Sequence, residues 1–213
     1  MLLLFFKTSF FNILFSFLFL YCFCLFVFAK KKKSRCATHP PVCETLSHPK
    51  LYARLLNTFV QICSTTEDPN YIANCLRIVA SCVNDKTTHL VQLIHTLKVD
   101  HLIIQLLNLQ IPDLITKETA PGHREAVQIS GNACKCLIAI VKDPDTKEVK
   151  DLAIRGGMIQ TIINIIRSTN DTSTRKNSAI VLARLAKSKE LMVVIRELRG
   201  MEILMSLGRM IVD

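Results

Sequence analysis

The 213-residue chain is poor in glycine and has no tryptophan. Its six glycines all follow residue 121, and they do not form the glycine pattern of a nucleotide-binding loop or of a nucleophile elbow. Residues 1–35 contain no Asp or Glu, although six of the Lys and Arg residues lie there. Ten of the eleven phenylalanines also lie in that stretch. The chain therefore has at least two unlike parts, and whole-chain averages describe neither.

The net charge of +10 comes largely from this N-terminal stretch. The remaining chain has 21 Lys and Arg against 17 Asp and Glu, a net charge of +4. This excess is small for a nucleic-acid-binding domain, and no aromatic residues are interleaved with the basic ones to stack on bases. We therefore expect no nucleic-acid partner.

Residues 8–29 form a nearly unbroken apolar run, followed at once by Lys30–Lys33. As a helix the run would be about 33 Å long, enough to cross a bilayer, and the lysines would keep the following residues in the cytosol. Two alternatives stay open. The run is a signal peptide, with Val27 and Ala29 at the positions read for cleavage, or it is AT-rich non-coding sequence added by a faulty gene model.

The region from residue 36 to residue 49 contains Pro40, Pro41 and Pro49. It predicts an irregular linker between the apolar run and the folded part. We therefore place the domain boundaries at 1–35, 36–49 and 50–213.

Several of the nine cysteines lie inside apolar, periodic stretches, where a free cysteine behaves as a small hydrophobic residue. These are Cys63, Cys75, Cys82, Cys134 and Cys136. The odd total also argues against a complete disulfide framework. We therefore expect residues 50–213 to lie in a reducing compartment, the cytoplasm.

No metal or cofactor site is expected. Cys134 and Cys136 are two residues apart on a predicted helix, so their side chains point about 200° from one another and cannot share an ion. His89, His95 and His101 are six residues apart and lack cysteine or carboxylate partners at zinc-site spacing. Because no nucleophile or acid–base constellation is visible either, the sequence predicts a protein that is not an enzyme.

After residue 50 the apolar residues recur every three or four positions, which predicts an all-α domain. Predicted helices cover residues 50–64, 71–83, 88–97, 100–109, 127–142, 146–155, 158–166, 175–187, 190–199 and 201–211. A long loop is expected over 110–122 because it contains Pro112 and Pro121. Gly156-Gly157 and Gly200 are expected to form turns between helices.

Three of these helices align without gaps, with Asn74, Asn132 and Asn177 in the same position. The offsets are 58 and 45 residues, and the proline-containing loop accounts for the longer one. Gly157-Met158 and Gly200-Met201 are 43 residues apart. A period in the forties with three helices per unit predicts stacked helical repeats, in which each repeat buries its apolar face against its neighbours.

The repeated segments resemble those of the armadillo-repeat family. Asn132-Ala133 and Asn177-Ser178-Ala179 look like the start of the family's third helix, and Gly156-Gly157-Met158-Ile159 looks like the turn before its second helix. The resemblance covers residues 50–213. It implies an armadillo-like right-handed superhelix, an α-α solenoid, of three to four repeats.

The C-terminal run from Arg175 to Leu204 is similar to the armadillo region of the tetratricopeptide repeat protein 12 family. That similarity implies a cytoplasmic, co-chaperone-like role in the assembly of axonemal dynein arms. No tetratricopeptide motif occurs in this chain, which would correspond to the tail of such a protein.

The family resemblance implies that the third helices line a groove in which partners bind as extended peptides. Family members that read basic localisation peptides place a Trp and an Asn four residues apart on this helix. The matching positions here are Arg77/Ser81, Lys135/Ala139 and Ile180/Arg184. Since none of these pairs fits and the chain has no Trp, we reject the importin-like function.

The candidate groove residues are Asn74, Arg77, Ser81, Asn132, Lys135, Asn177 and Arg184. The asparagine amides offer both donors and acceptors to a peptide backbone. The three cationic side chains predict an acidic or phosphorylated partner segment. The alternative is a solvated face on which the asparagines serve contacts between helices.

The sequence therefore predicts a non-catalytic scaffold for protein–protein interaction. The alternative is a membrane-anchored adaptor, held by residues 8–29 with its repeats facing the cytosol. The identity of the partner and the oligomeric state do not follow from the sequence.

Overall fold

The structure is a computed structural model that describes residues 40–66, 68–83, 87–116 and 118–212, without the side chains of residues 40–42 and 209–212. The apolar run at 8–29 and Lys30–Lys33 lie outside the described residues. All regular secondary structure in the described ranges is helical. The prediction of an all-α domain is thus confirmed.

The chain divides into two compact units, residues 1–45 and residues 46–213. The described part of the first unit forms most of helix α2 (Pro40–Leu46). The prediction of an irregular linker over 36–49 is therefore wrong at this point. Pro40 and Pro41 occupy the first turn, where a missing backbone N–H costs no helical hydrogen bond.

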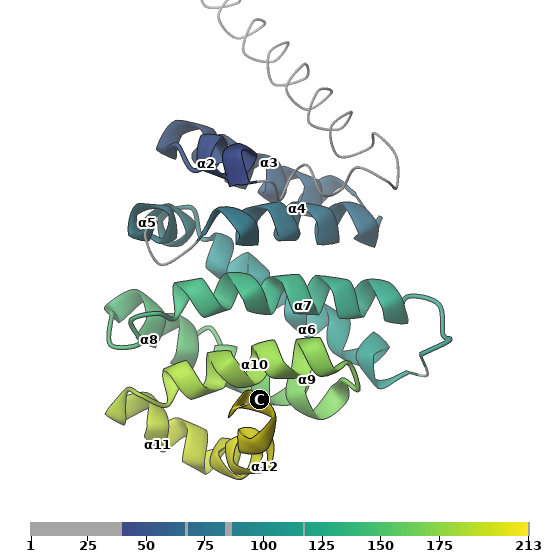
Figure 1. Ribbon diagram of the computed structural model, residues 1–213, viewed down its shortest axis with the longest axis vertical. Helices are drawn as coiled ribbons and strands as arrows, with labels where there is room; N and C mark the ends of the chain where they lie inside the picture. The colour runs from purple at the N-terminus through teal and green to yellow at the C-terminus, as the bar shows by residue number, and fades with distance from the viewer. Residues whose placement is uncertain (1–39, 67, 84–86, 117, 213) are drawn as a thin grey trace, which may run out of the picture. The chain divides into compact units, whose positions relative to one another are not determined.

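The second unit is a succession of helices joined by short loops (Figure 1). They are α3 (Pro49–Thr65), α4 (Pro69–Cys82), α5 (Thr88–Thr96), α6 (Val99–Ile115), α7 (His123–Ile140), α8 (Lys147–Ile154), α9 (Met158–Ser168), α10 (Thr172–Leu185), α11 (Lys189–Glu197) and α12 (Gly200–Val212). Each predicted helix is present, with ends shifted by a few residues.

Helix α6 differs most from its prediction. It continues through Pro112 to Ile115, in a region that was expected to be a loop. Pro112 is exposed, whereas Leu114, the last residue but one of α6, is 1% exposed. Burial of that apolar side chain offsets the cost of a proline inside a helix.

The two glycine positions that are expected to form turns differ in the structure. Gly157 has φ 71° and precedes α9, as the sequence predicts. Gly200 instead begins α12, and the left-handed residue before it is Arg199, with φ 57°. A Cβ on Gly200 would lie 2.7 Å from Cγ2 of Ile195, so this glycine permits a close approach rather than a turn.

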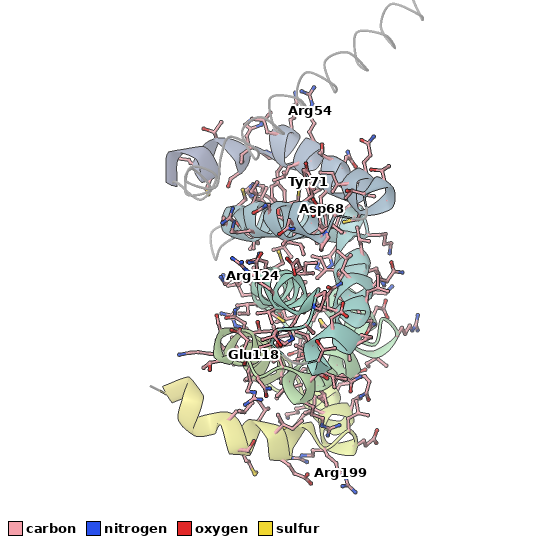
Figure 2. All side chains as sticks on the ribbon, turned by 90° about the vertical axis from the view of Figure 1, so that its right-hand side faces the viewer. Arg54, Asp68, Tyr71, Glu118, Arg124 and Arg199 are labelled. Carbon is pink, nitrogen blue, oxygen red and sulfur yellow. The ribbon has the colours of Figure 1, made fainter. Side chains whose placement is uncertain are left out.

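Helices α4, α7 and α10 carry the candidate site. Helix α7 packs against α4 and against α10, and α6 and α9 lie against α7 and α10 respectively. Figure 1 shows α4, α7 and α10 in that order, with their N-terminal ends on the right. Figure 2 is viewed from the side on which those ends lie, and it labels Asp68, the residue before α4, and Arg124 in the first turn of α7.

Side chains on these helices fill the space between them. Leu76 of α4, Leu137 of α7 and Leu182 of α10 are each 0% exposed. Asp68 and Asp171 cap α4 and α10 by accepting hydrogen bonds from the backbone N–H groups of Asn70 and Thr174. Capping fixes where α4 and α10 start, and burial fixes which face each of the three helices turns inward.

In the described part of the chain, no single helix has the length and apolar character needed to cross a membrane. Helices α5 and α6, bent by 75° at the break between them, meet that criterion only as a pair.

Candidate functional site

A hollow of about 300 Å³ lies across α4, α7 and the N-terminal turns of α10. Five of the seven residues that were selected from the sequence line it: Asn74, Arg77, Asn132, Lys135 and Asn177. They come from segments that are 58 and 45 residues apart in the chain. The fold therefore brings the three aligned asparagines to one place, together with two of the three selected cations.

Arg77 and Asn74 are one turn apart on α4 and interact with each other. Nη2 of Arg77 donates to Oδ1 of Asn74 at 3.1 Å. This bond orients the guanidinium along the helix face, where its planar set of donors suits carboxylate and phosphate oxygens.

Asn132 connects two of the helices. Its Nδ2 donates to the backbone carbonyl of Ala73 at 3.0 Å, from α7 to α4. The amide nitrogen of Asn132 therefore serves a helix contact, which is the role foreseen in the alternative to peptide binding. Its Oδ1 is not used in that bond.

Asn177 differs from the other two asparagines. Its Nδ2 is buried and has no hydrogen-bond acceptor within the described residues. A buried amide donor without a partner costs about 1–3 kcal/mol, so its presence at a hollow points to an acceptor that the described residues do not supply.

Helices α7 and α10 approach closely beside the hollow. A Cβ on Gly131 would lie 3.2 Å from Oγ1 of Thr174, tighter than most such contacts. Oγ1 of Thr174 in turn donates to the carbonyl of Val127 at 3.4 Å. Gly131 thus allows the two helices to meet, and it also lines the hollow.

Ser81 and Arg184 do not line the hollow. Oγ of Ser81 donates to the carbonyl of Arg77 at 2.7 Å, a bond within α4. Nη1 of Arg184 donates to the carbonyl of Ile138, so this side chain joins α10 to α7. Arg184 therefore serves the packing of the helices rather than the charge of the hollow.

The hollow carries two cationic side chains and one carboxylate, a net charge of +1 among its lining residues. Lys135 is exposed and Arg77 is half-buried. The carboxylate is that of Asp171, whose Oδ2 accepts from the N–H of Thr174 at 2.6 Å. The one anionic group is therefore engaged as the cap of α10.

Sequence reasoning missed the contribution of Asp171, Ser173 and Thr174, because the predicted helix starts only at residue 175. The structure starts α10 at Thr172, with Asp171 as its cap. Asp is one of the favoured residues directly before a helix, so Asp171 is a capping signal that could have identified this segment.

The buried thiols next to the hollow are protected from reaction. Burial raises the pKa of Cys134 to about 11, and its Sγ lies 3.2 Å from Oγ of Ser178. Burial also raises the pKa of Cys136, whose Sγ donates to the carbonyl of Leu76 at 3.7 Å. Both thiols are protonated near neutral pH and act as packing groups.

The histidines that were weighed as metal ligands lie elsewhere. Nδ1 of His95 is 2.7 Å from Oδ2 of Asp100 at the corner between α5 and α6. Asp100 is 3% exposed, and its other oxygen accepts from the N–H of His101. Among the described side chains, no group of three or more His, Cys, Asp or Glu is placed to hold a metal ion.

Comparison with known proteins gives no family assignment: no family model, no curated protein and no solved structure matches the chain.

Proposed function

We propose that residues 46–213 form a non-catalytic scaffold for protein–protein interaction, with an acidic, extended segment of the partner bound across α4, α7 and α10. The observation that supports this most is the convergence at one hollow. Asn74, Asn132 and Asn177 were selected from a repeat pattern alone, and all three line it. Amides offer both donors and acceptors, which are the groups that a peptide backbone also presents.

The armadillo-like arrangement is part of this proposal. Support comes from the packing of α7 between α4 and α10, and from the recurring short helix, glycine and longer helix in α8–α9 and α11–α12. In such a stack each repeat contacts its neighbours, and equivalent helices present a continuous face.

The charge of the hollow argues for an acidic partner. Arg77 and Lys135 add two positive charges, and the nearby carboxylate of Asp171 is held by its bond to the N–H of Thr174. A basic peptide would meet both cations and would be repelled. A neutral peptide would leave the charges solvated and gain only the contacts to its backbone.

A role in the assembly of axonemal dynein arms is a narrower proposal. It rests only on the similarity of the C-terminal run from Arg175 to Leu204 to the tetratricopeptide repeat protein 12 family. The proposed chemistry of the hollow does not depend on it.

The test is a binding titration with three labelled peptides of equal length, rich in Glu, in Lys or in Ser. The full-length chain is kept in a non-ionic detergent, and fluorescence anisotropy reports binding. We expect the Glu-rich peptide to bind most tightly, and its affinity to fall as salt screens the charges. Equal binding of all three peptides would contradict the proposal.

Substitutions of cations inside and outside the hollow test whether peptide binding depends on the charges of the hollow. Arg77→Gln combined with Lys135→Gln removes both cations of the hollow, and we expect it to weaken binding of the Glu-rich peptide by roughly tenfold or more. Lys187→Gln removes one exposed charge beyond the C-terminal end of α10 and outside the hollow. It should change the affinity by less than about twofold.

A further inference from the structure

We infer that the hollow is a subsite for one phosphorylated serine or threonine side chain of the partner. This inference rests on the proposed function, because it assigns the residue type that occupies the middle of the bound segment. Three helices contribute to it, and each supplies a different kind of donor.

The first two donors are charged. Arg77 of α4 offers a guanidinium, and Lys135 of α7 offers an ammonium. The bond from Arg77 to Asn74 holds the guanidinium at the hollow and so reduces the entropy lost when an anion binds. A guanidinium and an ammonium on neighbouring helices suit an anion that is large enough to reach both.

The third contribution comes from α10. Nδ2 of Asn177 is a buried donor without an acceptor among the described residues. Ser173 lies in the first turn of this 14-residue helix and also lines the hollow. Backbone N–H groups in a first turn have no helical acceptor, and the helix dipole favours an anion there. Asp171 takes up the N–H of Thr174 but not that of Ser173.

A phosphate group uses this set of donors better than a carboxylate does. A phosphorylated side chain carries a charge of about −1.5 to −2 and three acceptor oxygens. Three oxygens can accept from Arg77, from Lys135 and from the α10 donors at the same time. A glutamate has two oxygens and a single charge, which one of the two cations already balances.

The experiment compares three peptides that differ only at one central residue, which is Ser, phosphoserine or Glu in an otherwise acidic sequence. Anisotropy is measured on the full-length chain. We expect the phosphoserine peptide to bind about tenfold more tightly than the Ser peptide, with the Glu peptide in between. Inorganic phosphate should displace the phosphopeptide, and vesicles that contain phosphorylated inositol lipids should bind no more of the chain than vesicles of phosphatidylcholine alone.

Two variants with opposite expected effects exclude a merely structural explanation. Arg77→Gln should remove most of the preference for phosphoserine. Asp171→Asn keeps a good helix cap but removes the only carboxylate of the hollow, so it should strengthen phosphopeptide binding several-fold. Circular dichroism confirms that each variant is folded, and a loss of fold cannot produce the expected gain for Asp171→Asn.

The experiment distinguishes failure of the phosphate subsite from failure of the proposed function. If all three peptides bind equally well, the phosphate subsite is wrong while the acidic-peptide scaffold stands. If none of them binds, both proposals fall. Stronger binding to the vesicles with phosphorylated inositol lipids than to those of phosphatidylcholine alone, without binding to the phosphopeptide, would overturn the partner assigned here. Weaker phosphopeptide binding by Asp171→Asn would also overturn it.

Discussion

The side-chain amide of Asn132 donates to the backbone carbonyl of Ala73 at 3.0 Å, across the contact between α7 and α4. Asn74, aligned with it in sequence, bonds instead to Arg77 on its own helix. Asn177 has a buried amide nitrogen with no acceptor within the described residues. The three positions that align in sequence thus have different roles. One amide joins two helices, one orients Arg77, and one has no acceptor among the described residues, so their substitutions should differ.

Asn132→Ala should lower the free energy of unfolding by about 1 kcal/mol, because it removes a hydrogen bond between two helices. Asn74→Ala is the matched control, since it removes only a bond within α4 and should cost about 0.5 kcal/mol or less. Urea denaturation followed by circular dichroism measures both. Equal losses would show that the bond to Ala73 has no special role.

Gly157→Ala should lower the free energy of unfolding by about 1 kcal/mol. Gly157 has φ 71°, and a Cβ there would meet no atom within 4 Å, so the cost is purely conformational. Gly208 lies within α12 and is equally open. Gly208→Ala should therefore raise the free energy of unfolding, by up to about 1 kcal/mol. The urea concentration at the midpoint of unfolding should therefore fall for Gly157→Ala and rise for Gly208→Ala.

Pro112→Ala should stabilise the protein. The substitution restores a backbone N–H inside α6 at an exposed position. The helical gain of up to about 3 kcal/mol is partly offset by greater freedom of the unfolded chain, which leaves about 1–2 kcal/mol. Thermal unfolding measures the change. An unchanged or lower midpoint would mean that α6 needs the bend that a proline imposes.

The free energy of unfolding should fall with rising pH above about 8.5, where the thiols of the unfolded chain ionise. Burial raises the pKa of Cys134 to about 11 in the folded state, so its contribution is complete below 8.5 and is lost as pH rises to about 11. Each such thiol lowers stability by about 1.4 kcal/mol per pH unit in this window. Urea titrations at several pH values measure the slope, and Cys134→Ala should reduce it.

Much of the fold follows from apolar periodicity, because each helix buries one stripe of side chains. The errors lie where tertiary contacts override local preference. Pro112 predicts a helix end, but burial of Leu114 extends α6 beyond it. Gly200 predicts a turn, but a close approach to Ile195 explains the residue better. Neither contact can be read from a single sequence.

The candidate site was predictable in part. The sequence alignment of Asn74, Asn132 and Asn177 was sufficient to place them together, because α7 packs against both α4 and α10. Arg184 shows the limit of that argument, since a long side chain at an aligned position bonds to the carbonyl of Ile138 instead. The cap at Asp171 was missed because the predicted helix starts at residue 175, three residues after the observed start of α10.

The central claim is that a peptide lies across α4, α7 and α10. Hydrogen–deuterium exchange of the full-length chain, with and without the Glu-rich peptide, tests it most directly. The account predicts slower amide exchange at residues 73–77, 127–135 and 171–177, with residues 189–197 of α11 unchanged. Protection confined to α11, or none under conditions where the peptide is bound, would contradict it.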